Sequence, residues 1–180
     1  MNLKNRGFVT GVLGFVIGSF VTSQFVFGQD AHPIDGPLTH VAMVFRDVDK
    51  AAKTFGDIFG VEVATPRIIR NVPFPPSHGG ATMSVKHTMV MTNNNITLEL
   101  LQPVEGPSPW QDFLDNNGEG VHHLAFTVND FNQAVTFLRD KGGQWVQGND
   151  TVNFGYVDMT PQLGFTVEVV GASGVRMPAQ

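Results

Sequence analysis

Two histidines and two glutamates occupy matching places in two similar stretches of this sequence. His40 stands in THVAMVF and His123 in HHLAFTV, while Glu99 stands in NITLELL and Glu168 in GFTVEVV. Imidazole nitrogens and carboxylate oxygens hold zinc and other divalent transition metals where cysteine is absent, and this chain has no cysteine. The four residues are therefore a candidate ligand set for one divalent cation.

The alternation of side chains along a strand selects these residues. Neighbouring strand residues point to opposite faces, so at most one of His122 and His123 can face a given site. The match with His40 selects His123, and in both strands the large apolar residues lie on the other face, where a helix would cover them. An acid within an apolar strand is costly to bury unless it is paired or bound to a cation, which favours the same site for both glutamates.

A repeat in the chain would position these residues. Residues 37–104 and residues 120–172 each predict a strand, a helix and further strands, the last of which carries a glutamate. Residues 105–119 form a linker with a short helical turn, bounded by Pro and Gly. The repeat occurs only twice, which indicates a duplicated module within one domain of residues 37–180.

Local signals set the bounds of the predicted helices. We expect Asp47 and Asp130 at their starts and Gly60 and the pair Gly142–Gly143 at their ends. The apolar residues of each helix recur on one face, and residues 71–80, NVPFPPSHGG, predict a loop. The apolar positions are Ala51, Phe55, Ile58 and Phe59 in the first helix, and Phe131, Val135 and Leu138 in the second.

The first 28 residues are of another kind. A basic start, MNLKNR, precedes a long uncharged apolar run that ends at Gly28. This pattern predicts either a signal peptide cleaved after Gly28 or a membrane anchor through residues 8–28, with residues 29–36 as a linker. Both interpretations place the domain outside the cytoplasm, as an exported, periplasmic or membrane-anchored protein.

Composition excludes several classes of function. The net charge is −5, and no Lys/Arg cluster follows the first residues, so nucleic acid is not expected as a partner. The absence of cysteine excludes disulfides, zinc–thiolate sites and thiol nucleophiles. The expected partner is a small-molecule substrate.

Four stretches carry a resemblance to a known family: SPWQDFLDNNGEGVHHLAFTVNDF, THVAMVFRDVDKAAKTF, TLELLQP and TPQLGFTVEVV. They resemble the vicinal oxygen chelate superfamily, which includes glyoxalase I, extradiol dioxygenases and bleomycin resistance proteins, and within it methylmalonyl-CoA epimerase. The resemblance covers residues 38–170 and implies an α+β fold, in which two βαβββ modules form a cupped mixed sheet around one metal. It also implies a homodimer. The implied ligands of a zinc, cobalt, nickel, manganese or iron ion are His40, Glu99, His123 and Glu168.

The resemblance implies a metal-dependent isomerase, epimerase or lyase that stabilises an enolate of a substrate with vicinal oxygens. Glu99 or Glu168 would be the catalytic base. Epimerases of the family carry an acid before the third strand, but residues 71–91 contain none, so His78 or His87 would carry a proton there. We expect these two histidines and Gln102 to contact the substrate.

Two alternatives remain open at this point. A non-haem iron dioxygenase uses two histidines and one carboxylate, so a second glutamate counts against it. A non-catalytic binding or resistance protein would not need metal ligands. We also expect Trp110 to pack its short helix onto the sheet, whereas the facing of Tyr156 is not decided, and the predicted export argues against an acyl-CoA substrate.

Overall fold

The computed structural model describes residues 32–73, 82–92, 96–149 and 153–172. The predicted signal or anchor segment and His78 lie outside these ranges. Within them, no helix has the length and apolar character needed to cross a membrane.

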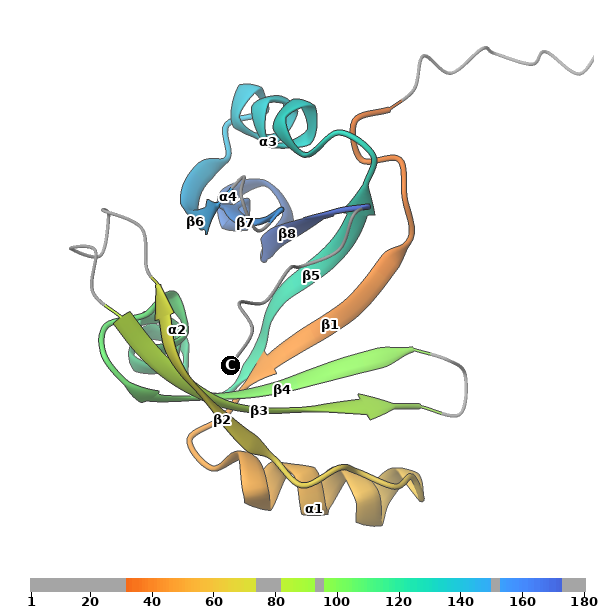
Figure 1. The fold of residues 1–180 in the computed structure, drawn as a ribbon, viewed down its shortest axis with the longest axis vertical. Helices are drawn as coiled ribbons and strands as arrows, with labels where there is room; N and C mark the ends of the chain where they lie inside the picture. Colours follow the sequence, from red (N-terminus) through yellow and green to blue (C-terminus); the bar gives the residue numbers. More distant parts are fainter. Residues whose placement is uncertain (1–31, 74–81, 93–95, 150–152, 173–180) are drawn as a thin grey trace, which may run out of the picture. The chain divides into compact units, whose positions relative to one another are not determined.

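The chain forms two successive modules with the same order of elements, except that the second has an additional short helix before its last strand (Figure 1). The first consists of β1 (Leu38–Val44), α1 (Val48–Phe59), β2 (Arg67–Pro73), β3 (Thr82–Met91) and β4 (Thr97–Glu105). The second consists of β5 (Gly120–Val128), α3 (Phe131–Asp140), β6 (Gln144–Asn149), β7 (Phe154–Asp158), α4 (Thr160–Leu163) and β8 (Thr166–Gly171). The short helix α2 (Pro109–Asn117) lies between them.

All eight strands join one mixed sheet in the order β2-β3-β4-β1-β5-β8-β7-β6. The antiparallel pair β1–β5 joins the two modules, and each of these strands pairs in parallel with the last strand of its own module. The strands curve around a hollow, with α1 and α3 packed outside it (Figure 1). The predicted α+β fold of two βαβββ modules is confirmed.

The two faces of the sheet bury different residues. On the helix face, Leu100 packs with α1 and Val169 packs with α3. The opposite face, here called the inner face, carries His40 and Glu99 and has an apolar core of its own. Its buried residues are Ala42, Val44, Met83, Val85, Leu101, Trp110, Leu114 and Tyr156.

The helices begin where the sequence predicts. The Asp47 and Asp130 carboxylates accept hydrogen bonds from backbone N–H groups three residues on, at 3.0 and 2.9 Å, which satisfies a free donor of each first turn. Gly60 ends α1 in the left-handed conformation. The predicted apolar face of α1 is buried only in part, because Ile58 and Phe59 near its end are 69% and 52% exposed.

Two local features differ from the prediction. Residues 71–73, expected in a loop, complete β2, because a register shift after Ile69 and a positive φ of 55° at Asn71 accommodate the chain in the strand. Asparagine tolerates this conformation better than most residues. The helix α4 was not predicted. It is a single turn with Pro161 as its second residue, and Gly164 ends it.

The segment before β1 packs against the second module. Asp35 accepts hydrogen bonds from the backbone and side chain of Asn129, at 3.2 and 2.6 Å. The His32 ring contacts the Phe137 ring edge-on, with 4.9 Å between centroids. Residues 32–36, predicted as part of a linker, are therefore held by the domain.

Candidate functional site

The four candidate ligands meet on the inner face, two from each module. Glu168 Oε2 lies 3.0 Å from His40 Nε2 and 3.1 Å from His123 Nε2. Glu99 Oε2 lies 3.4 and 3.7 Å from the same two nitrogens. His40, His123 and Glu168 form the tightest group, with one donor atom of each within 4.8 Å of the others.

Register explains the convergence. Ala42 pairs with Glu99 across β1–β4 and with His123 across β1–β5, so both side chains flank the small Ala42 on one face. His40 pairs with Ala125, which pairs in turn with Glu168 on β8. Two alanines therefore lie between the larger residues and leave room for their side chains to meet.

Hydrogen bonds orient the His40 ring. The Thr39 hydroxyl donates to the carbonyl oxygen of Ala125 at 3.1 Å and lies 3.3 Å from His40 Nδ1. Because the hydroxyl proton is already used, the oxygen accepts from Nδ1–H. In a neutral His40 the lone pair is then on Nε2, which faces the two glutamates.

A β-bulge changes the predicted place of His122. Ala42 pairs with His123 and Met43 with Val121, so His122 is an extra residue in β5. Strict alternation fails at a bulge, and the His122 ring lies against the His123 ring, with 2.9 Å between their Nδ1 atoms. His122 does not join the four-residue group but is positioned to fix the orientation of His123, a role that alternation alone does not reveal.

Burial and a neighbouring charge decide the protonation of His122. Burial lowers the pKa of His122 to about 3, with a further contribution from the charge of His123. His122 is therefore neutral at physiological pH, and its Nδ1 can accept a hydrogen bond from His123 Nδ1–H. In a neutral His123 the lone pair is then on Nε2, which faces Glu168.

The carboxylates hold their charge although they are buried. Burial raises the pKa of Glu99, but the neighbouring imidazoles of His40 and His87 and the charge of His123 outweigh it and lower the pKa. The pKa of Glu168 is lowered against burial in the same way by His123 and His40. Burial lowers the pKa of His40, but both glutamates outweigh it and raise the pKa to about 10.

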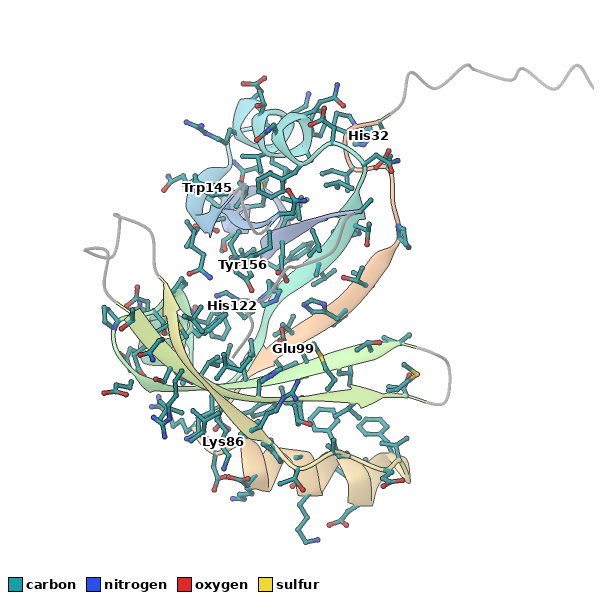
Figure 2. The ribbon with its side chains drawn as sticks, viewed as in Figure 1. His32, Lys86, Glu99, His122, Trp145 and Tyr156 are labelled. Carbon is teal, nitrogen blue, oxygen red and sulfur yellow. The ribbon has the colours of Figure 1, made fainter. Side chains whose placement is uncertain are left out.

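Two further residues border the group. Tyr156 pairs with Glu168 across β7–β8, and burial and the two glutamate charges raise its pKa, so its hydroxyl stays protonated. His87 Nδ1 lies 3.5 Å from Glu99 Oε1. Figure 2 shows Glu99, His122 and Tyr156 toward the hollow of the sheet, and Lys86 on the side of α1, where it pairs with Asp49.

The donor set suits a divalent metal. Two imidazole nitrogens and carboxylate oxygens suit zinc and the neighbouring transition metals. Glu168 Oε2 is buried and makes no hydrogen bond of normal geometry, although it lies between two imidazoles. A buried carboxylate oxygen without a hydrogen bond is costly, and a cation at this point would remove the cost.

Residues 39–156 match the model of the Glyoxalase/Bleomycin resistance protein/Dioxygenase superfamily. The chain belongs to this superfamily. The match covers the first module and the second as far as residue 156, and it includes three of the four candidate ligands, His40, Glu99 and His123.

The curated relatives include several methylmalonyl-CoA epimerases. The chain is similar to "Methylmalonyl-CoA epimerase, mitochondrial" of Bos taurus, with 34% identity over 118 residues that cover 62% of this chain and 61% of the relative. It is 31% identical to "Ethylmalonyl-CoA/methylmalonyl-CoA epimerase" of Cereibacter sphaeroides, over 61% of this chain and 73% of the relative. The match thus spans about three fifths of the bovine protein.

Solved structures support the superfamily fold. The methylmalonyl-CoA epimerase of Mycobacterium tuberculosis superposes with a TM-score of 0.55 at 22% identity, over 82% of this chain and 91% of that one. The Streptomyces coelicolor enzyme in complex with 2-nitronate-propionyl-CoA gives 0.52 at 20% identity, over 77% and 99% of the two chains. At this identity the likeness concerns the fold alone.

The remaining predicted contacts have separate outcomes in this superfamily member. Gln102 does not reach the site, because it points to the helix face and its Oε1 accepts a hydrogen bond from Val48 N at 3.0 Å, at the start of α1. His78 lies outside the described residues. Trp110 packs α2 onto the inner-face core, as expected.

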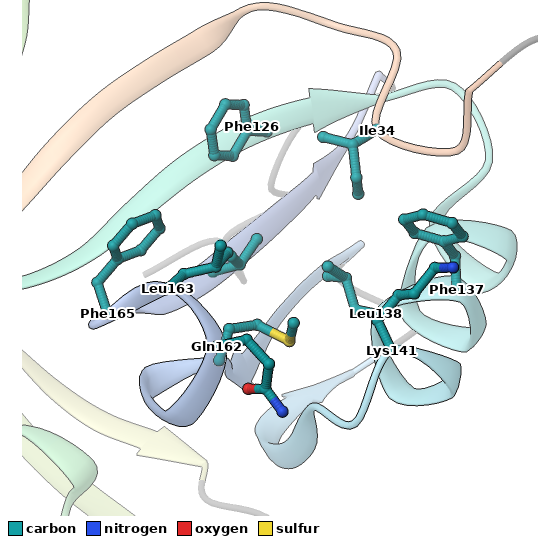
Figure 3. A pocket seen from close by; sticks show the side chains of 10 residues that line it. Ile34, Phe126, Phe137, Leu138, Lys141, Gln162, Leu163 and Phe165 are labelled. Atoms are coloured by element: carbon teal, nitrogen blue, oxygen red, sulfur yellow. The ribbon is translucent and has the colours of Figure 1, made fainter.

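A separate apolar pocket lies on the helix face of the second module (Figure 3). It has a volume of about 370 Å³, and Ile34, Phe126 and Phe165 line it together with side chains of α3 and α4. Phe126 points away from the inner face that carries its neighbour Ala125. This pocket is therefore distinct from the candidate metal site.

Proposed function

We propose that this chain is a divalent-metal-dependent epimerase, isomerase or lyase that removes a proton next to a carbonyl of a substrate with vicinal oxygens. The observation that carries the proposal is the convergence of His40, His123 and Glu168 with Glu99 beside them. The similarity to methylmalonyl-CoA epimerases supports the same reaction type.

His40, His123, Glu168 and Glu99 would hold the metal. A divalent cation bound there acts as a Lewis acid toward the neighbouring oxygens of a substrate and lowers the energy of an enolate. The protein contributes the fixed imidazole orientation, which Thr39 and His122 set, and a buried charge pair that favours a cation.

Glu99 is better placed than Glu168 to serve as the base. Glu168 is 6% exposed and lies between both imidazoles at 3.0 and 3.1 Å, whereas Glu99 is 14% exposed and lies at 3.4 and 3.7 Å. The carboxylate with looser contacts and more solvent access moves at lower cost. Glu99 would take the proton from the α-carbon.

His87 would exchange this proton with the surroundings. Its Nδ1 lies 3.5 Å from Glu99 Oε1, the oxygen that does not face the two imidazoles. Both ring nitrogens of His87 are buried without a hydrogen bond, so neither is committed to another group. The imidazole of His87 thus supplies a proton carrier within residues 71–91, a stretch that contains no acid.

The proposal specifies the reaction type but not the group, such as CoA, to which the acyl part of the substrate is attached. The named relatives act on CoA thioesters, whereas the sequence of residues 1–28 predicts export, and we propose an extracytoplasmic location for the domain. A substrate that carries the same vicinal oxygens on another carrier fits both statements.

A second candidate function is a non-haem iron dioxygenase. The tightest group, His40, His123 and Glu168, has the two-histidine, one-carboxylate composition of such centres. The chain is also 24% identical to 4-hydroxyphenylpyruvate dioxygenase of Pseudomonas aeruginosa, over 73% of this chain and 36% of the relative. Iron dependence together with oxygen consumption would favour this candidate over the first.

Exchange of a substrate proton with solvent tests the first proposal. The metal-loaded protein is incubated in deuterated water with methylmalonyl-CoA and with the truncated thioester methylmalonyl-N-acetylcysteamine, and deuterium at the α-carbon is followed by mass spectrometry. We expect exchange that chelation of the metal abolishes. No exchange with either probe under any divalent metal would overturn the assignment for substrates of this class.

The variant Glu99→Gln separates the roles. We expect weaker metal binding and at least about a hundredfold slower exchange, because both a charge and a base are lost. Glu105→Gln on the same strand is the matched control, since Glu105 is exposed and its carboxylate accepts a hydrogen bond from the Ser84 hydroxyl at 3.4 Å. Full metal content and full exchange in Glu99→Gln would remove Glu99 from the mechanism.

A further inference from the structure

Unpaired buried polar atoms gather on the inner face. Buried polar groups in folded proteins are nearly always hydrogen-bonded, so each exception needs a reason. Trp110 and Gln147 are exceptions to which the proposed reaction gives no role. In the described part of the chain, the residues with such atoms are His87, Trp110, Gln147 and Glu168.

A second β-bulge turns Gln147 toward the inner face. Trp145 pairs with Val157 on β7, but Gln147 pairs with Tyr156, so Val146 is an extra residue. Without the bulge, Gln147 would share the face of Trp145, which packs in the core under α3. Instead Gln147 lies beside Tyr156, 3% exposed, and its Oε1 has no partner. Bulges often redirect a side chain next to an active site.

Trp110 approaches the same place from α2. It is 5% exposed, and its ring packs edge-on against Tyr156 with 6.3 Å between centroids. Its indole Nε1–H has no acceptor. Trp110 and Gln147 thus border Tyr156 on β7, which pairs with the candidate metal ligand Glu168 on β8.

We propose that Trp110 and Gln147 form a distal subsite on the inner face that receives an uncharged hydroxyl or amide group of the substrate. Such a group accepts from the indole N–H and donates to the amide oxygen. A charged group would lose its water against two neutral partners, which is costly. This inference rests on the proposed function, because the metal that Glu168 and its partners would hold binds the other end of the substrate.

The register of the sheet sets the reach of the substrate. Two strand steps, from β8 to β7 and from β7 to β6, separate Glu168 from Gln147. Neighbouring strands are about 4.8 Å apart, so the polar group lies about 10 Å from the metal-binding end. A chain of about six atoms beyond the chelating oxygens covers this distance.

Three hydroxamates test the subsite on the zinc-loaded protein, because hydroxamates chelate metals through two neighbouring oxygens. Acetohydroxamate reports on the metal site alone. Hexanohydroxamate and 6-hydroxyhexanohydroxamate differ only in a terminal hydroxyl. By isothermal titration calorimetry, we expect the hydroxylated compound to bind about tenfold more tightly than its methyl-terminated partner, since it satisfies two buried atoms.

Variants connect this preference with the two residues. Gln147→Leu and Trp110→Phe should each remove the preference for the hydroxyl and leave acetohydroxamate affinity unchanged. Gln144→Leu, at an exposed position of the same strand, is the matched control and should keep the preference. Gln147→Leu should also raise the Tm of the ligand-free protein by about 3 °C, because it removes an unsatisfied buried oxygen.

The outcomes separate the two proposals. If acetohydroxamate does not bind to the zinc-loaded protein, the metal site fails and the subsite falls with it. If acetohydroxamate binds but the terminal hydroxyl makes no difference, only the subsite is overturned. A lower Tm in Gln147→Leu with an unchanged hydroxyl preference would likewise overturn it and assign Gln147 a structural hydrogen bond.

Discussion

The protonated His40 gives the metal-free protein a distinctive dependence of stability on pH. In the folded chain, Glu168 and Glu99 overcome burial and raise the pKa of His40 to about 10, whereas an unfolded histidine titrates near 6.5. The stabilisation is therefore complete below pH 6.5 and is lost as the pH rises toward 10. The lowered pKa values of the two glutamates act only below about pH 4.5, so they do not change between pH 7 and 9.

The size of this effect follows from linkage. Between the two pKa values, each pH unit costs about 1.4 kcal/mol, so the metal-free protein should lose about 2.5 kcal/mol between pH 7 and 9. For a domain of this size, the loss lowers the Tm by about 5–8 °C. With zinc bound, His40 Nε2 holds the metal in place of the proton, and the decline should disappear.

Differential scanning calorimetry at pH 7, 8 and 9 checks this expectation, with chelator and with zinc. His40→Gln without metal is the control, because it lacks the titrating group and should show a nearly flat profile. Equal declines with and without zinc, or a decline that persists in His40→Gln, would refute the assignment of the proton to His40.

Two further predictions concern single positions. His122→Phe keeps an aromatic ring but removes the partner of His123 Nδ1, so zinc affinity measured by chelator competition should fall about tenfold while the Tm changes little; unchanged affinity would contradict the orienting role. Gly36→Ala should lower the unfolding free energy by about 2 kcal/mol, because a Cβ there collides with the carbonyl oxygen of Thr127. Gly60→Ala, at a position with open space and φ 63°, should cost only about 1 kcal/mol in urea denaturation; equal costs would show that the collision is relieved.

Strand periodicity predicted that the candidate metal ligands share one face, because the regular parts of the sheet obey it. Side chains alternate regularly in the stretches that contain His40, Glu99 and Glu168. The alignment of the two sequence repeats therefore matched these residues before the pairing of the strands was known. The same rule places Gln102 on the face opposite to Glu99, since the two residues are three positions apart in the strand. Its selection as a pocket residue was wrong for a reason that the sequence already contained.

The bulges mark the limit of this reasoning. His122 and Gln147 each face a direction that alternation forbids, because Ala42 on β1 and Tyr156 on β7 impose a register with one extra residue opposite. Such a register depends on the pairing partner, which the local sequence does not specify. The sequence did not predict the orientation of these two residues, because it depends on pairing with strands that are distant in the chain.

The division of the candidate ligands between the modules has a mechanical consequence. His40 and Glu99 belong to the first module and His123 and Glu168 to the second, so a bound cation would cross-link strands β1 and β5 at the seam of the duplicated domain. Each module keeps its own helix-covered core on either side of this seam. Removal of the ion should therefore speed amide hydrogen exchange first along β1 and β5. The core amides that exchange fastest would show whether the ion holds the two modules together.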